Sequence, residues 1–166
     1  MIEQLQPFFG DFLLKNRLSF HHAGHIDGHS VQTKLGIHSE TKFTHEPRKI
    51  ISQYPSMFRK FDIGIVPLNN IPFNHAKSAI KGLEYTAAGI PFVESYSPEY
   101  ELLAEQGVGR VARNENEWVE HLTELLDPRI RKQEIDKNYE NLKALHTIER
   151  RGTEWNDVLN KIRENS

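Results

Sequence analysis

The chain has 166 residues, a mass of 19.3 kDa and a formal net charge of -2. That length suits one domain with its own core, and the 37% of hydrophobic and 27% of charged residues argue against a disordered protein. The near-neutral charge gives no general attraction to nucleic acid, no apolar run is long enough to cross a bilayer, and the absence of cysteine excludes disulfides.

The order of the sequence patterns predicts an α/β fold, because short β-type runs alternate with helical patterns. Strands are predicted at 17–22, 41–44, 62–67, 91–94 and 109–112. Helices are predicted at 2–14, 31–35, 47–61, 77–88, 98–106, 114–126, 128–145 and 147–163. This order indicates a single domain over 1–166, with a Rossmann-like parallel sheet of about five strands flanked by helices. The C-terminal helices, from about residue 114, are expected to pack back onto the sheet.

The first residues bear on location. Met1 and the residues after it lack the basic and apolar regions of a signal peptide, and the chain has no cysteine, as in proteins of a reducing compartment. The expected location is therefore the cytoplasm. Membrane association is not indicated.

The segment after the third predicted strand carries the strongest candidate site. Asn74 can cap the helix that follows, and Lys77 and Ser78 then lie near free backbone N–H groups, which suits a diphosphate. Lys77, Lys81 and Glu84 share one helical face, so Glu84 can accept the hydroxyls of a ribose. Spacing alone also fits a solvated helix whose Lys–Glu pairs contribute only ~0.2–0.5 kcal/mol each.

Two longer strings favour the site over the solvated helix. The segment 61–68 contains Asp62-Ile-Gly-Ile-Val-Pro-Leu, and 73–93 contains Lys81-Gly-Leu-Glu-Tyr-Thr-Ala-Ala-Gly-Ile-Pro-Phe-Val. Together they resemble the C-terminal donor-binding domain of retaining GT-B glycosyltransferases (glycosyl transferases group 1), where D-I-G-I-x-P-L precedes K-x-L-E-Y-x-A-x-G-I-P-x-V. The similarity extends to Tyr54-Pro55, 97–100, 107–109 and 117–118. No G-x-G-x-x-G fingerprint follows any predicted strand, which disfavours a different nucleotide-binding α/β protein.

The resemblance implies roles for individual residues. Glu84 corresponds to the acid that holds the ribose of a nucleoside-diphosphate sugar, and Lys77 and Ser78 correspond to positions near its diphosphate. The first acid of the family's paired-glutamate motif corresponds to Ala76 here. The loop at 45–47 is expected to approach the nucleotide base. The implied transferase uses no metal and no cofactor beyond the nucleotide-sugar, which is its donor substrate.

Two departures from the family limit what this chain is expected to do. Such domains begin with a strand and a glycine-rich turn that bears basic groups, whereas here one helix precedes the strand predicted at 17–22. The sequence also shows no acceptor-binding domain, so that domain or chain is an expected partner, and an isolated half is expected to be inactive because it cannot orient an acceptor. Catalytic residues and the acceptor stay unassigned. The alternative is a catalytically inactive GT-B-like domain that serves as a binding or partner module.

A histidine-rich stretch between the first two predicted strands needs a separate interpretation. His21, His22, His25, Asp27 and His29 are suitable metal ligands by type, but they do not match a standard ligand spacing. We therefore predict a polar loop and no metal site. His25 follows a glycine at a strand end, so it is predicted to lie near the sugar or phosphate.

Four aromatic side chains complete the predictions. Trp118 and Trp155, spaced with leucines, are predicted to pack in the core. Tyr96 and Tyr100 follow the fourth predicted strand, where they either flank the site or lie at its rim.

Overall fold

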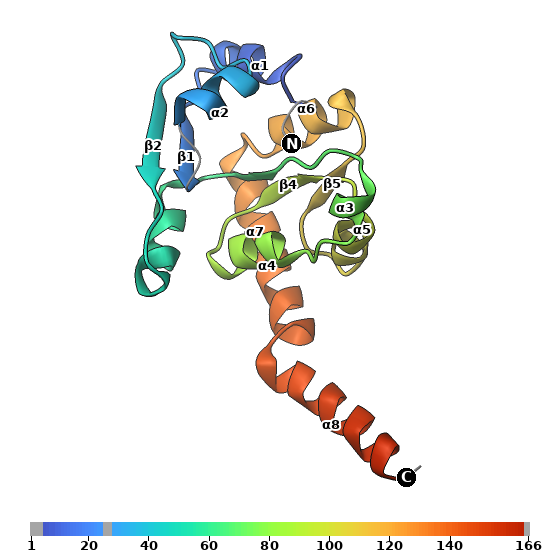
Figure 1. Cartoon of the computed structure of the whole chain (residues 1–166). Coiled ribbons are helices and arrows are strands. Elements are labelled where there is room, and N and C mark those ends of the chain that lie inside the picture. Colours follow the sequence, from blue (N-terminus) through green and yellow to red (C-terminus); the bar gives the residue numbers. More distant parts are fainter. Residues whose placement is uncertain (1–4, 25–27, 165–166) are drawn as a thin grey trace.

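The computed structural model describes residues 5–24 and 28–164. All described strands are parallel and helices flank them, as the sequence predicts, but the strands form two separate ladders. One ladder has the order β1-β2 and the other β3-β4-β5 (Figure 1). The strands are β1 (Phe20–Gly24), β2 (Phe43–Pro47), β3 (Gly64–Val66), β4 (Phe92–Ser95) and β5 (Arg110–Ala112).

Strand β4 lies at the centre of the larger sheet, and all four of its residues are buried. Phe92 and Val93 are fully buried, which explains why the sequence shows a continuous apolar run there rather than an alternating one. Gly64 of β3 pairs with Phe92, and Val93 pairs with Arg110 of β5. The strand is buried on both faces, as expected for parallel α/β construction.

Helices occupy both faces of the sheets. They are α1 (Phe9–Lys15), α2 (Gly28–Lys34), α3 (Pro72–His75), α4 (Ile80–Ala87), α5 (Pro98–Glu105), α6 (Glu115–Glu124), α7 (Pro128–Leu145) and α8 (Ile148–Glu164), together with the 3-10 helix η1 (Ile51–Lys60). Side-chain caps begin three of them: Ser97, Asn114 and Asp127 each accept a backbone N–H from the first turn of the following helix. The cap and Pro128 together set the start of α7 where the sequence predicts it.

The apolar side chains form two clusters, one on each face of the larger sheet. Helix α6 covers one face, where Trp118 is buried beside Leu5 and Val93, and this cluster continues to α1 and α2 beside the smaller ladder. Helices α4 and α5 cover the other, where Phe92 packs with Leu103. The prediction that Trp118 belongs to the core is confirmed.

Three helix predictions differ from the structure. The helix expected at 2–14 is α1, which begins only at Phe9. The segment expected as a helix at 47–61 is the 3-10 helix η1, with Pro55 inside it and with Ile51 exposed rather than on a buried face. The helix expected at 77–88 begins at Ile80, and it ends close to the expected place, before Gly89, whose positive φ of 71° suits a glycine.

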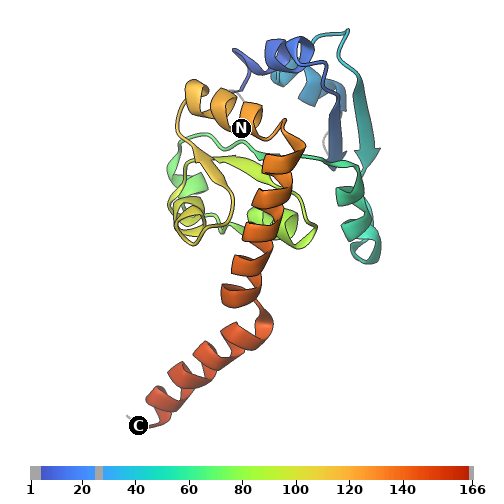
Figure 2. The same cartoon turned by 180° about the vertical axis from the view of Figure 1, so that it is seen from behind.

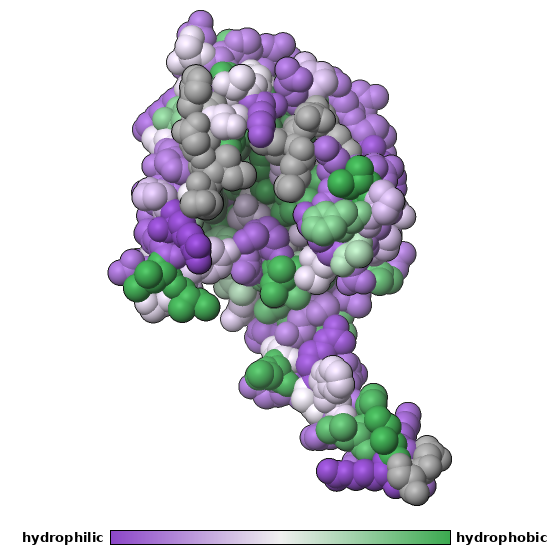
Figure 3. Space-filling view, in the orientation of Figure 1, coloured by the Kyte–Doolittle hydropathy of each residue, from purple (hydrophilic) through white to green (hydrophobic). Residues whose placement is uncertain are grey.

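The last helix departs most from expectation. None of the residues of α8 is buried, and the helix projects away from the rest of the molecule (Figures 1 and 2). Trp155, predicted to pack in the core, is 68% exposed, and other apolar side chains follow it along the helix (Figure 3). An amphipathic pattern predicts that a helix has an apolar face, but it does not determine whether that face packs against the rest of the same chain. Within the described residues, no helix is both long enough and apolar enough to span a membrane.

Candidate functional site

A cleft of about 480 Å3 opens between η1 and α4. Its walls combine aromatic, acidic and basic side chains with the small residues of the end of α4. They are Tyr54, Pro55, Ser56, Phe58, Arg59, Glu84, Ala87 and Ala88. The cleft therefore brings Glu84 of the predicted site next to Tyr54 of the Tyr54-Pro55 similarity, although the two residues are 30 positions apart in the sequence.

Glu84 lies at the centre of the polar contacts in this cleft. Its side chain is 30% exposed and forms an ion pair with Lys81, one helical turn earlier on α4. The Tyr54 hydroxyl donates a hydrogen bond of 2.8 Å to the same carboxylate oxygen, Oε2. The prediction that Lys81 and Glu84 share a helical face is confirmed, and Glu84 faces the cleft rather than the apolar interior.

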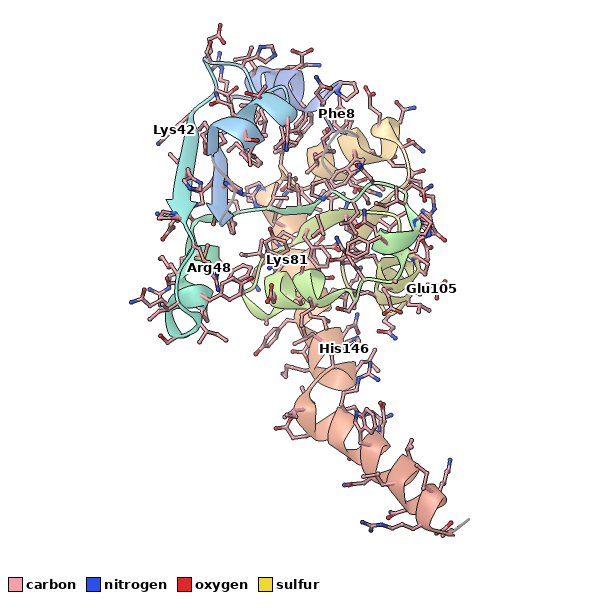
Figure 4. The ribbon with its side chains drawn as sticks, in the orientation of Figure 1. Phe8, Lys42, Arg48, Lys81, Glu105 and His146 are labelled. Carbon is pink, nitrogen blue, oxygen red and sulfur yellow. The ribbon has the colours of Figure 1, made fainter. Side chains whose placement is uncertain are left out.

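Lys81 links the two walls of the cleft electrostatically. Its Nζ donates to the Tyr54 hydroxyl and lies 5.2 Å from the centroid of that ring and 5.8 Å from that of Phe58. Burial opposes the ammonium charge, but the hydrogen bonds to Glu84 and Tyr54 outweigh it and raise the pKa of Lys81. Lys81 (Figure 4) is therefore a positive charge held beside Glu84 by their ion pair.

An aromatic framework beneath the cleft holds α4 and η1 together. The Phe58 ring meets Tyr85 edge-on, with centroids 5.5 Å apart, and Tyr85 stacks on Phe92 of β4 at 5.9 Å. Burial raises the pKa of Tyr85 to about 12, so this tyrosine stays neutral at physiological pH. The polar residues of the cleft therefore lie above a layer of uncharged aromatic rings.

A second charged network joins β2 to η1. The Glu46 carboxylate pairs with Lys49 and, at 3.1 Å, with Lys60, and Lys49 also donates to the Ser56 hydroxyl. Hydrogen bonds from the two lysines lower the pKa of Glu46 to about 2. Residues 45–47, predicted to form a loop near a nucleotide base, are instead the end of strand β2, and Arg48 follows them next to η1 (Figure 4).

The predicted helix cap at Asn74 is wrong. Pro72 starts the short helix α3, so Asn74 lies inside that helix rather than before α4. It is buried, and its amide donates a 2.8 Å hydrogen bond to the backbone carbonyl of Asn69. Asn74 therefore stabilises the loop after β3, and α4 begins after Ala79 without a side-chain cap.

Lys77 and Ser78 lie in the turn that precedes α4. They do not share a helical face with Lys81 and Glu84, because the helix begins only at Ile80. The Lys77 ammonium lies 4.9 Å from the centroid of the Phe73 ring, and Ser78 is exposed. Both nevertheless stand beside the amino-terminal end of α4, whose first N–H groups carry the positive end of the helix dipole.

Three histidines, His21, His22 and His45, lie close together on the paired strands β1 and β2. His25, predicted to lie near the sugar or phosphate, falls outside the described residues. The Nδ1 atoms of His22 and His45 are 3.0 Å apart, and His21 Nδ1 is 2.7 Å from the Thr44 hydroxyl. Burial, followed by the neighbouring His45, lowers the pKa of His22. Among the residues 5–24 and 28–164, no group of three or more possible ligands could hold a metal ion.

The carboxyl edge of the larger sheet carries a smaller pocket, of about 220 Å3, that was not predicted from the sequence. Asn70, Tyr96, Ala112 and Arg113 line it. The Arg113 guanidinium lies 5.6 Å from the centroid of the Tyr96 ring. Of the two tyrosines predicted at the site or its rim, Tyr96 is therefore at a pocket, whereas Tyr100 is buried in the core.

The contribution of Tyr54 was also missed. The sequence placed it inside the helix predicted at 47–61 without a functional role, and the only further signal was the Tyr54-Pro55 similarity. The pairing of its hydroxyl with Glu84 depends on the approach of η1 to α4, which helical spacing within one segment does not reveal.

The fold places the chain among proteins that resemble one half of a GT-B glycosyltransferase. The crystal structure of WaaG, "a glycosyltransferase involved in lipopolysaccharide biosynthesis", matches with a TM-score of 0.57 and 14% sequence identity over 86% of this chain. The match covers 40% of WaaG, so this chain spans less than half of that protein's length. The chain belongs to the glycosyl transferase-like family, whose sequence profile matches residues 11–157. No curated protein sequence matches it.

Proposed function

We propose that this chain is the donor-binding, C-terminal part of a retaining glycosyltransferase, and that the cleft between η1 and α4 holds a nucleoside-diphosphate sugar. Family membership supports a glycosyltransferase domain. The observation that carries the finer proposal is the half-buried carboxylate of Glu84, fixed by Tyr54 and Lys81 on the wall of a cleft of about 480 Å3.

Glu84 is suited to a ribose because an ionised carboxylate accepts two hydrogen bonds from neighbouring hydroxyls. The Tyr54 hydroxyl and the Lys81 ammonium already donate to its Oε2 atom. A ribose diol takes the place of these donors or adds to them at the free oxygen. The aromatic rings beside the carboxylate exclude water from one side, which strengthens such charge-assisted hydrogen bonds.

The amino-terminal end of α4 is suited to the diphosphate. Lys77 and Ser78 precede the helix, and Lys81 lies in its first turn. Two ammonium groups, a hydroxyl and the free N–H groups of the helix start can neutralise phosphate oxygens. The same groups would stabilise the charge that develops on the leaving diphosphate when the sugar is transferred.

Isothermal titration calorimetry with UDP-, GDP- and ADP-glucose tests the proposal. At least one nucleotide-sugar should bind, and Glu84→Gln should weaken its binding by about 10- to 100-fold, because the loss of a charge-assisted hydrogen bond costs roughly 1.5–3 kcal/mol. Glu105→Gln is the matched control: Glu105 is exposed at the end of α5, away from the cleft (Figure 4), and binding should not change.

Circular dichroism of both variants should show unchanged folding. If no nucleotide-sugar binds at millimolar concentration, or if Glu84→Gln binds as tightly as the parent, the cleft is not a donor site. The inactive binding module then becomes the better interpretation of the fold.

A further inference from the structure

Helix α8 carries an exposed apolar stripe along one side. Its large apolar side chains are all between 46% and 82% exposed; they are Ile148, Trp155, Val158, Leu159 and Ile162. Four of these side chains and one glycine recur at alternating intervals of four and three residues, namely Ile148, Gly152, Trp155, Leu159 and Ile162. This alternation is the spacing of the seam along which two helices of a coiled coil meet. We call these five positions the α8 seam.

The charges of α8 indicate what kind of partner suits the seam. The helix has four basic and four acidic residues, so its net charge is zero. Helices that lie on a membrane surface carry an excess of lysine and arginine on their polar face, which α8 lacks. A narrow apolar seam flanked by charges of both signs is instead typical of a helix that pairs with another helix.

Two charged residues make the seam complementary to itself. Glu149 and Arg163 lie near opposite ends of α8, and each directly follows a seam residue, Ile148 or Ile162. Neither forms an ion pair with another residue in the described part of the chain. If two copies of α8 run antiparallel, Glu149 of each copy faces Arg163 of the other, so that the two-fold symmetry produces this ion pair twice.

The sizes of the seam side chains fit the same antiparallel register. It places Gly152 of one copy opposite Ile162 of the other, and Trp155 opposite Leu159. A Cβ at Gly152 would meet no atom within 4 Å, so the glycine leaves open space on the seam for the isoleucine. A parallel pair would instead place Trp155 opposite Trp155 and Gly152 opposite Gly152, which leaves neighbouring layers overfilled and underfilled.

We propose that α8 pairs with α8 of a second copy of this chain as a two-stranded antiparallel coiled coil. Because α8 projects away from the rest of the molecule, the pairing leaves the two bodies at opposite ends of the dimer (Figures 1 and 2). The seam is short, so the dissociation constant of the dimer should lie above roughly 10 µM. At the concentration of about 1 µM used for fluorescence, α8 is then unpaired.

Sedimentation equilibrium of the whole chain from roughly 10 to 500 µM tests the proposal. The parent should dimerise in this range. Glu149→Arg should raise the dissociation constant at least about tenfold, because each of the two ion pairs becomes a repulsive pair. The double variant Glu149→Arg, Arg163→Glu restores both pairs, so its dissociation constant should lie within about threefold of the parent's.

Asp157→Arg is the matched control. It makes the same change in net charge as Glu149→Arg, but Asp157 lies on the side of α8 opposite the seam. The dissociation constant of this variant should stay within about threefold of the parent's. Circular dichroism should show the same helix content in all four proteins, which separates a lost dimer from a melted helix.

Three results would overturn the proposal. The first is a parent that stays monomeric over the whole range, and binding of this monomer to phosphatidylglycerol vesicles would then assign the seam to a lipid surface. The second is an equal effect of Glu149→Arg and Asp157→Arg. The third is a double variant that dimerises as weakly as Glu149→Arg, because Glu149 would then not face Arg163. No measurement involves a nucleotide, so the outcome is independent of the donor-site proposal.

Discussion

The buried carboxyl group of Glu94 should make the stability of this domain depend strongly on pH. Glu94 lies on the central strand β4, is fully buried, and both its carboxyl oxygens lack a hydrogen-bond partner within the described structure. Burial raises its pKa to about 10. The folded state therefore holds the protonated form, while an unfolded chain ionises near the ordinary value of 4.5.

The sign and size of the effect follow from this difference. The contribution of Glu94 to the free energy of unfolding is greatest below pH 4.5, where its carboxyl group is protonated in both states. This contribution is lost as the pH rises toward 10, because only the unfolded state releases the proton in that range. The free energy of unfolding should fall by about 1.4 kcal/mol per pH unit, or about 3 kcal/mol between pH 5 and pH 7. Glu94→Gln cannot ionise, so its stability should lack this decline.

Urea denaturation followed by circular dichroism at pH 5, 6, 7 and 8 measures the effect. Other groups titrate in this range, so the informative quantity is the difference between parent and Glu94→Gln, which should grow in favour of the variant by about 3 kcal/mol from pH 5 to pH 7. Glu105→Gln, at an exposed position, should follow the parent at every pH. Parallel curves for the parent and Glu94→Gln would refute the assignment of a neutral, buried carboxyl group.

Two paired substitutions test the packing of the core. Gly109→Ala should lower the free energy of unfolding by about 2–4 kcal/mol, because a Cβ there would lie 2.4 Å from the Phe92 ring at a φ of +80°. Gly89→Ala should cost only the ~1 kcal/mol of backbone strain, because Gly89 has a φ of +71° and a Cβ there would meet no atom within 4 Å. Equal losses for the two variants in urea denaturation would contradict the predicted overlap with Phe92. Trp118→Ala should cost about 3–5 kcal/mol because its side chain is fully buried, whereas Trp155→Ala should stay within ~0.5 kcal/mol. Iodide should quench the fluorescence of Trp155 far more than that of Trp118, and the reverse order would show that α8 packs against the body in solution.

The element boundaries that sequence predicts best are those set by local chemistry. Helix α7 spans Pro128–Leu145, the range predicted, because Asp127 caps it and a proline occupies its first position. Strands shift by one to three residues, since an apolar run does not determine which of its residues pair. The separation of the strands into two ladders could not be predicted from sequence patterns, because it depends on the tertiary arrangement of β1 relative to β3.

The candidate site was predictable where one helix carries it. The spacing of Lys81 and Glu84 gives their pairing directly. Asn74 was assigned to the wrong helix because Pro72 starts a separate turn of helix before it. Tyr54 could not be placed at all, since its contact with Glu84 arises from the packing of η1 against α4 through Phe58.

The two walls of the cleft differ in how firmly they are held. Helix α4 lies close to the sheet because Gly82 and Gly64 leave room for the rings of Phe92 and Tyr85; a Cβ at either glycine would come within 3 Å of those rings. The other wall, η1, is a 3-10 helix, with poorer hydrogen-bond geometry than an α-helix, and an ion-pair network ties it to β2. We therefore expect a ligand that enters the cleft to displace η1 and its Tyr54, while α4 keeps Glu84 in a fixed position on the sheet.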